Sequence, residues 1–585
     1  MRYWLALVFL RDFGFEVGHW TPISLDVVTK ALGCTRRNAQ FVIKRLVDEA
    51  IIDWKSGVGR GNLPQLQLQR SVGESITEQA KAWMNEGKAE QALSLIKASD
   101  RDQFIADYVG QYQQSQSEQD ILQVPFYRAT HSLNPIEISR RSERHIADYL
   151  YAQLLRFNSK SGQFEGDLAQ TWQYNGETLK LTLRKSLKFW DGSPLTAFDV
   201  EACYQAIIES HSVSRGLFVL IDQFAALDDQ TLIVRSKRLA HYLPMLMTHG
   251  ALAVSKKTDS GVVGSGSFRL AEQTDYRTLL LASPHYHGFR PWLDGVEIWN
   301  MGLSAKDFPL NCDIVHGSSA PKESSDYKQV QQWEEGCIYA CLNSARHPWM
   351  KLLKHRKYIQ QLLQTLPMNG VRDTMLYRRA SGMICDESQR SEKSILVSKA
   401  PPLSTSSKLS KSPKPVLSPK QQELNSTPLQ VLTYQLPGHI EAAENIVHLL
   451  NSNGVKASLT VLSYPEFDHV ERQAQADIIV SGEVFGDHRE SSWLGWLLCT
   501  NTLLACLNRQ SKPWLDQQVF DTLGISDEEK RVKGYQKIEK QLIKKAIYFP
   551  LFHCAQDMRI SSKINAMDLL TNGWVDFNQV VFESH

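Results

Sequence analysis

The chain has 585 residues, of which 42% are apolar and 22% are charged, and its formal net charge is +2. This length exceeds what one hydrophobic core usually organises, so we expect two or three folding units. The near-neutral charge excludes an attraction of the whole protein to nucleic acid, and any such attraction must be local.

Cysteine usage and the N-terminus indicate a reducing compartment. The nine cysteines are scattered and form no C-x-x-C pair, which argues against a disulfide framework or a zinc site. Eight apolar residues follow Arg2, but Arg11 and Asp12 end the run and no cleavage site follows, so we expect a buried first helix rather than a signal peptide. No run approaches the roughly 18 apolar residues of a membrane span. We therefore expect a cytoplasmic protein without a membrane partner.

The first seventy residues have the pattern of a helix-turn-helix. Apolar residues recur at helical spacing from Ile23 to Leu32, with Ser24 as the expected N-cap. Gly33 is expected to end this helix in the left-handed conformation, and Thr35 is expected to cap the next one.

The second helix is expected to run to Ala50 with Phe41, Val42, Leu46 and Ala50 facing inward. The polar residues on its first turns and outer face are of types that reach base edges and phosphates. These candidate DNA contacts are Arg36, Arg37, Asn38, Gln40 and Lys44.

A hairpin follows the second helix. The segments "IIDW" and "LPQLQLQ" are predicted strands, and "KSGVGRGN" between them is a flexible tip that carries Lys55 and Arg60. Residues 1–70 hold ten Lys and Arg against six Asp and Glu, whereas residues 71–120 hold four against nine. The positive charge therefore ends with a predicted winged-helix domain, residues 1–70, which we expect to bind double-stranded DNA. Winged helices also serve as protein-interaction modules, and this alternative stays open.

Two segments have the composition of connections. Residues 71–120 are polar and helical in pattern, and we expect a helical connector there. Residues 394–428 are dense in Ser, Pro and Lys without hydrophobic periodicity, which predicts a flexible loop.

Residues 121–585 alternate strands with helices, as an α/β domain does. Within Glu165–Ile207, "TLKLTLR" is a predicted half-buried strand, "WDGSPL" a turn, and Thr196 a helix cap with Asp199 three residues on. This run resembles the signature of the family 5 solute-binding proteins, the oligopeptide and dipeptide binders of ABC importers. The later stretches "VGSGSFRL" and "SPHYHGFRPWLDGVEIW" continue the resemblance. It implies a two-lobed, periplasmic-binding-protein-like fold of type II.

A solute-binding fold behind a winged helix resembles the SgrR-type transcriptional regulators over the full length. The motifs "CTRR", "GRG" and "RRSERHIADYLYAQLLRFN" carry this likeness. It implies a DNA-binding head that is controlled by a small molecule, a sugar phosphate or a peptide-like ligand, held between two lobes.

Five residues are candidates for ligand contacts. Arg128, His131 and Asn134 follow the first strand of the large domain, and open α/β sheets bind ligands at such strand ends. Trp493 and Trp496 lie in "SSWLGWLLCTNT", whose polar and apolar alternation suits a cleft wall. A structural ion pair for Arg128 and core positions for the tryptophans are the alternatives.

No motif indicates an enzyme, a metal or a cofactor. His285 and His287 lie in a turn to which the family resemblance gives no metal role. We therefore expect a one-component transcriptional regulator. The alternatives are a transport-associated oligopeptide-binding protein with an added N-terminal interaction domain, and a protein scaffold. The ligand, the operator, the sign of regulation and the oligomeric state are not encoded in any local pattern.

Overall fold

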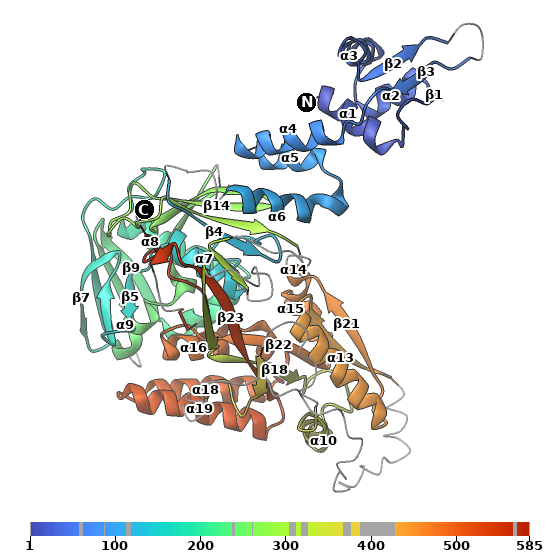
Figure 1. Ribbon diagram of the computed structural model, residues 1–585. Coiled ribbons are helices and arrows are strands. Elements are labelled where there is room, and N and C mark those ends of the chain that lie inside the picture. The colour runs from blue at the N-terminus through green and yellow to red at the C-terminus, as the bar shows by residue number, and fades with distance from the viewer. Residues whose placement is uncertain are drawn as a thin grey trace.

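The protein has a small N-terminal head, a helical arm and a two-lobed body, shown in Figure 1 from blue to red along the chain. This is a computed structural model. It describes residues 2–57, 62–86, 88–112, 119–236, 240–259, 261–302, 312–316, 326–366, 376–385, 427–565, 570–571 and 573–583. The predicted loop 394–428 lies outside the described residues except for its last two positions, and so does Arg60.

The head is a winged helix. Its elements are α1 (Arg2–Asp12), β1 (Trp20–Pro22), α2 (Leu25–Ala31), α3 (Arg36–Asp48), β2 (Ile52–Lys55) and β3 (Gln65–Leu68). The three strands form an antiparallel sheet in the order β1-β3-β2. The predicted first helix and the Ser24 and Thr35 caps are confirmed, because both side chains accept the expected backbone N–H and α1 buries its apolar face. Gly33 has a φ of +54° after α2, as predicted.

Three helices form the arm. These are α4 (Gly73–Asn85), α5 (Ala89–Leu95) and α6 (Arg101–Tyr112), with a short 3-10 turn at Ala98–Asp100. Trp83 of α4 packs edge-on against Trp4 of α1, with ring centroids 6.3 Å apart. One continuous cluster of buried apolar side chains runs from the head through the arm to Trp299 in the body. The arm therefore packs on both of its neighbours.

The first lobe is built on a four-stranded sheet in the order β13-β14-β15-β4. Its elements are β4 (Ile121–Phe126), α7 (Arg141–Leu150), β13 (Phe268–Gln273), β14 (Arg277–Ala282) and β15 (Gly295–Asn300). β4 and β15 are parallel although about 170 residues separate them, and the C-terminal pair β24 (Ile564–Asn565) and β25 (Val581–Phe582) returns to the core of this lobe.

A middle unit is inserted between α7 and β13. It contains a sheet of order β7-β8-β10-β9, two strand pairs, α8, α9 and short 3-10 turns. The strands are β5 (Leu155–Asn158), β6 (Gln163–Gly166), β7 (Ala169–Asn175), β8 (Thr178–Leu183), β9 (Gln223–Asp228), β10 (Thr231–Arg235), β11 (Ser255–Thr258) and β12 (Gly261–Gly264). The helices are α8 (Ala197–Glu209), α9 (Leu243–Leu246) and the 3-10 segment η2 (Val213–Leu220). The predicted capping box of Thr196 and Asp199 is present at the start of α8.

The second lobe surrounds an eight-stranded sheet with the main order β16-β23-β18-β22-β20-β21. Its strands are β16 (Ile314–His316), β17 (Tyr327–Trp333), β18 (Gly336–Leu342), β19 (Leu376–Arg379), β20 (Leu429–Tyr434), β21 (Ala457–Leu462), β22 (Ile478–Val484) and β23 (Tyr548–Ser561). Its helices are α10 (Leu353–Leu363), α13 (Pro437–Ser452), α14 (Tyr464–Phe467), α15 (Val470–Ala474), α16 (Arg489–Cys499), α17 (Asn501–Ala505), α18 (Ser511–Leu523) and α19 (Glu528–Lys544).

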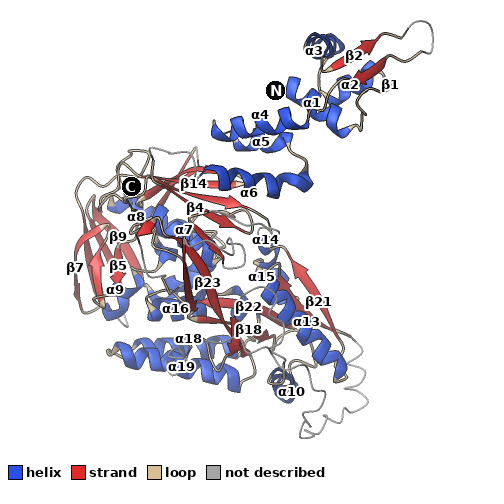
Figure 2. Cartoon of the chain, viewed as in Figure 1, coloured by secondary structure: helices blue, strands red, loops and turns tan. Residues whose placement is uncertain are grey.

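The long strand β23 joins the two lobes. It pairs with β18 near its start, while Met558 and Ile560 near its end pack in the core of the first lobe. Figure 2 shows helices around the sheets of both lobes, so the predicted α/β class is confirmed. In the part of the chain that is described, no helix has the length and apolar character needed to cross a membrane.

Candidate DNA-binding face and interlobe junction

Helix α3 packs on the core of the head through a different set of residues than the sequence predicted, and its outer face is exposed. Ala39, Ile43 and Leu46 are buried in the head core, at spacings of four and three residues. Phe41 is 61% exposed, and Ala50 is exposed beyond the helix end. The predicted inward positions of Phe41 and Ala50 are therefore wrong, while that of Leu46 is confirmed.

Three of the predicted DNA contacts on α3 are free of ion pairs. Arg37, Gln40 and Lys44 are exposed, and neither of the two cations among them has an ion pair within the described residues. Asn38 is half-buried, and its backbone N–H is bound by the Thr35 cap.

Arg36 differs from these residues because it is already paired. Its guanidinium donates to both carboxylate oxygens of Asp26 on α2, at 2.6–2.8 Å. Both side chains are about two-thirds exposed, so water screens the pair and its contribution to stability is small. To read a base, Arg36 must leave Asp26.

The described part of the wing supplies one predicted contact. Lys55 is exposed, and its Nζ lies 3.8 Å from the ring centroid of Trp20, a cation–π contact on the sheet of the head. This contact holds the lysine beside β1 with its charge open to water.

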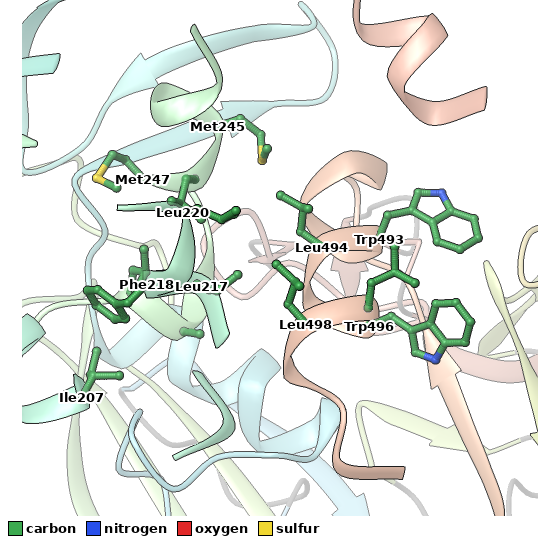
Figure 3. Close-up of a cluster of buried hydrophobic side chains, with 14 of the residues drawn as sticks. Ile207, Leu217, Phe218, Leu220, Met245, Met247, Trp493, Leu494, Trp496 and Leu498 are labelled. Carbon is green, nitrogen blue, oxygen red and sulfur yellow. The ribbon is translucent and has the colours of Figure 1, made fainter. Parts of the chain in front are cut away.

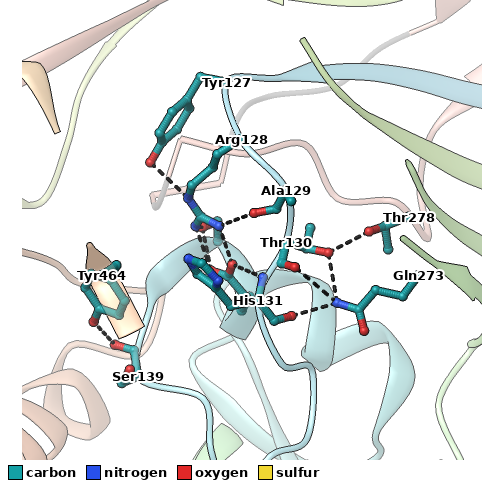
Figure 4. A network of polar contacts seen from close by, with 11 residues as sticks. Tyr127, Arg128, Ala129, Thr130, His131, Ser139, Gln273, Thr278 and Tyr464 are labelled. Carbon is teal, nitrogen blue, oxygen red and sulfur yellow. Dashed lines mark hydrogen bonds and ion pairs between the residues drawn. The ribbon is translucent and has the colours of Figure 1, made fainter. Parts of the chain in front are cut away.

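The two lobes meet at a set of polar side chains that we call the interlobe junction: Arg128, His131, Arg140, Arg141 and Glu143 of the first lobe, with Glu334, Tyr434, Tyr464 and Glu483 of the second. Figure 4 shows the first-lobe loop after β4, where Arg128 and His131 lie, close to Tyr464 on α14. The Tyr464 hydroxyl donates to the carbonyl of Ser139 at 3.3 Å, which connects the lobes directly.

Arg128 forms a bidentate ion pair with Glu143 on α7. Its Nη1 and Nη2 donate to the Glu143 carboxylate at 2.6 and 2.9 Å, and Glu143 is buried. Burial by itself would raise the pKa of Glu143, but the hydrogen bonds and charge of Arg128, with the His131 N–H, lower it to about 2. Arg128 therefore has a structural partner, the alternative that its sequence context left open.

His131 and Asn134 shape the same loop. The His131 carbonyl accepts from Gln273 at 2.7 Å, and its ring is stacked on Tyr464 with centroids 6.3 Å apart. Burial, followed by the charge of Arg128, lowers the pKa of His131, so its ring is neutral near pH 7. Asn134 caps the next turn by accepting from the Ile136 N–H at 3.3 Å. Of the five predicted ligand contacts, only Arg128 and His131 are brought together here.

Trp493 and Trp496 lie elsewhere, inside the core. Both are on α16 and at most 1% exposed. Figure 3 shows α16 facing Leu217, Leu220 and Met245 of the middle unit, in one large apolar cluster. The indole N–H of Trp493 is buried and has no hydrogen-bond partner among the described residues. In this conformation the tryptophans are positioned to join the middle unit to the second lobe rather than to face a ligand.

Arg140 and Arg141 present two further guanidinium groups at the junction. Arg140 lies 3.9 Å from the ring centroid of Tyr464 and 5.3 Å from that of Tyr434, and it has no ion pair among the described residues. Arg141 pairs with Glu334 at 2.6 Å across the lobes. Burial raises the pKa of Glu483 on β22 to about 7 even though the charge of Arg141 opposes it.

Two other clusters of polar side chains lie outside the junction. A cavity of about 340 Å³ is lined by Arg184 and His287 among others, but Arg184 donates to the Asp167 and Gly166 carbonyls and His287 lies 2.7 Å from the Asp167 carboxylate. Their polar atoms are thus already engaged.

Potential metal-ligand atoms of His488, Glu490 and Glu528 lie within 4.8 Å of one another. The Glu490 carboxylate accepts hydrogen bonds from Arg531 Nε and Nη2, at 2.6 and 2.9 Å, and from the Tyr535 hydroxyl at 3.0 Å. Because Arg531 balances its charge, we assign no metal to this group.

Comparison with known proteins gives two matched domains. Residues 8–120 match the family described as Sugar transport-related sRNA regulator N-term, and residues 163–307 match Bacterial extracellular solute-binding proteins, family 5 Middle. The HTH-type transcriptional regulator SgrR of Yersinia pseudotuberculosis is 22% identical over 98% of both chains. The chain resembles the SgrR-type regulators over its full length. The protein YbaE of Escherichia coli K12 is 24% identical over 96% of both chains.

Solved structures agree on the fold of the body. OppA of Burkholderia pseudomallei aligns with a TM-score of 0.60 and 16% identity, over 80% of this chain and 100% of that one. The murein tripeptide binding protein MppA of Escherichia coli gives 0.59 and 16%, over 80% and 99%. The body therefore has the fold of family 5 solute-binding proteins, as the sequence predicted.

Several junction residues of this SgrR-like chain escaped the sequence analysis. The adjacent pair Arg140 and Arg141 was visible as part of the "RRSERH" motif, and two cations at the start of a helix, where the helix dipole disfavours positive charge, are a signal for a functional role. Glu334 and Glu483 had no local signal, because they are about 190 and 340 residues away from these arginines.

Proposed function

We propose that this protein is a one-component transcriptional regulator that binds duplex DNA through α3 and the wing and responds to a small molecule at the interlobe junction. The observation that carries the proposal is the continuous apolar cluster from the head, through the arm, to β15 of the solute-binding body. Such a core makes the orientation of the head depend on the first lobe. A transport protein with an unrelated added domain has no need of it.

DNA binding is supported by the charge of the α3 face. Arg37 and Lys44 are exposed and have no ion pair among the described residues, and Lys55 is exposed at the end of β2, where the wing begins. Unpaired cations gain the full benefit of releasing counterions from the phosphate backbone, since no protein ion pair must be broken first.

Ligand binding is supported by the chemistry of the junction. Arg140 has aromatic faces beneath it but no carboxylate at ion-pair distance among the described residues, so an anionic group of a ligand is a suitable counterion. Glu334 and Glu483 nearby can accept hydrogen bonds from hydroxyl or amino groups. A sugar phosphate and a short peptide both combine an anion with such donors, so both classes are candidate ligands.

The route between the two sites passes through a short series of contacts. Thr130 in the junction loop hydrogen-bonds Thr278 on β14 at 2.6 Å. The adjacent Arg277 lies 5.4 Å from the ring centroid of Trp299 on β15. Trp299 in turn packs edge-on against Tyr108 on α6, with centroids 6.0 Å apart. We infer that displacement of the junction loop is transmitted to the arm through β14 and β15.

The arm is also anchored by polar contacts that favour rigid transmission. Arg101 at the start of α6 donates to the Tyr276 hydroxyl at 2.8 Å. Gly302, with a φ of +67°, lets the chain after β15 approach α6, because a Cβ there would lie 2.6 Å from Asp102 Oδ2. These contacts at the start of α6, together with that of Tyr108 further along the helix, reduce the freedom of the head to move independently of the lobe.

The proposal is tested by measuring the affinity of the full chain for duplex DNA from its own upstream region, with and without sugar phosphates or di- and tripeptides. A ligand that acts through the junction should change DNA affinity by roughly 5- to 150-fold, and DNA should change ligand affinity by the same factor. The same measurement on Tyr108→Ala separates binding from coupling: both individual affinities should persist, and the coupling should fall. Absence of DNA binding in the unmodified chain would contradict the regulator function.

A further inference from the structure

Phe41 is the large apolar side chain that α3 exposes at its centre. It is 61% exposed, whereas the apolar residues of the packing stripe of α3 are buried. An isolated exposed apolar residue needs no explanation on an ordinary surface. On the outer face of a helix that otherwise carries cations, however, it provides a contact of a different chemical kind.

Phe41 lies within the row of unpaired polar residues. Arg37, Gln40 and Lys44 are four residues before, one before and three after it, so all four share one face of the helix. The Arg37 guanidinium lies 6.0 Å from the Phe41 ring centroid, at the outer limit of a cation–π contact. An apolar ring thus lies between positive or hydrogen-bonding groups.

We propose that Phe41 is a specificity-determining residue that contacts the 5-methyl group of a thymine in the major groove. In the major groove thymine is the base that presents a methyl group, and apolar side chains recognise it by contact. This inference rests on the proposed DNA-binding function and adds to it the identity of one recognised base. A second copy of this chain fits the face poorly, because two such faces would bring Arg37 and Lys44 of both copies together.

The experiment separates the methyl group from the rest of the base. A high-affinity duplex is selected from a randomised library with the full chain, and each thymine in it is then replaced by uracil, which lacks only the methyl group. For one thymine, the replacement should weaken binding of the unmodified chain about fourfold, the equivalent of burying one methyl-sized group. Fluorescence anisotropy at about 50 mM salt gives both affinities.

Three variants complete the test. Phe41→Ala should bind the thymine and uracil duplexes equally, and Phe41→Leu, which stays apolar, should keep part of the preference. Lys44→Ala is the matched control on the same face: it should weaken both duplexes alike and keep the full thymine preference. Thermal unfolding of Phe41→Ala should match that of the unmodified chain, because the ring is mostly exposed.

The outcomes distinguish this inference from the proposed function. If the unmodified chain binds duplex DNA without any preference for thymine over uracil, or if Phe41→Ala keeps the preference, the inference is wrong and the regulator function is untouched. If the unmodified chain binds no duplex, both fail. If sedimentation shows that Phe41→Ala breaks a dimer while thymine preference persists, Phe41 is a self-association contact and the inference is again wrong.

Discussion

The α3 face and the interlobe junction are both rich in arginine, but the arginine side chains Arg37, Arg128 and Arg141 differ in whether a carboxylate pairs with them. On α3, Arg37 is exposed and has no ion pair among the described residues. At the junction, Arg128 and Arg141 each have a carboxylate within 2.6 Å, and their partners Glu143 and Glu334 are buried. Cations facing a polyanion gain from being unpaired, whereas a carboxylate buried between the lobes needs a counter-charge because burying an uncompensated charge is costly. The half-buried Arg140, which has no ion pair among the described residues, is the exception at the junction.

Removing the partner of Arg128 should have the largest effect on stability. Glu143→Gln leaves the mostly buried guanidinium without its counter-charge, and losing one member of a buried pair costs about 3 to 5 kcal/mol. Urea unfolding of the full chain measures the loss of unfolding free energy, taken from the transition in which the two-lobed body unfolds. A loss below about 1 kcal/mol would mean that water reaches Arg128 and that the junction resembles the α3 face.

The same carboxylate predicts a pH dependence. The pKa of Glu143 is lowered from 4.5 to about 2 in the folded protein, so its contribution is fully present above pH 4.5 and is lost as the pH falls toward 2. A shift of this size corresponds to about 3 kcal/mol. The difference in unfolding free energy between the unmodified chain and Glu143→Gln should therefore shrink across this window, and a constant difference would contradict the depressed pKa.

An unpaired cation on α3 should matter to DNA rather than to stability. Arg37→Ala should reduce affinity for a selected duplex by about 1 to 3 kcal/mol and relax preference at one base position. Arg45→Ala is the matched control, since Arg45 on the same helix is paired with Glu49 at 2.8 Å and should change DNA affinity less. Equal losses for the two variants would show that pairing does not decide which cations contact DNA.

The smallest expected effect comes from the exposed ion pair of Arg36 with Asp26 in the head. Asp26→Asn removes the partner of Arg36 at a site where both side chains are about two-thirds exposed, and it should cost at most about 1 kcal/mol of unfolding free energy. The freed Arg36 should bind DNA slightly more tightly, which anisotropy at low salt can measure. Weaker DNA binding by Asp26→Asn would mean that the pair holds Arg36 in its binding position.

Local chemistry determined much of this protein from its sequence. Ser24, Thr35 and the box of Thr196 and Asp199 cap helices where predicted, because a cap depends on residues only three positions apart. The α/β class followed from the alternation of strands and helices. The solute-binding fold was implied by the resemblance of the run from Glu165 to Ile207 to the family 5 signature.

Tertiary structure decided what depends on distant partners. The side of α3 that faces the core was set by its packing against α1 and β2, and Phe41 therefore lies outward although its neighbour Val42 is half-buried. Trp493 and Trp496 are core residues because the middle unit packs onto α16. Arg141 meets Glu334 across 193 residues of chain, and no short-range pattern in the sequence specifies which carboxylate balances which arginine.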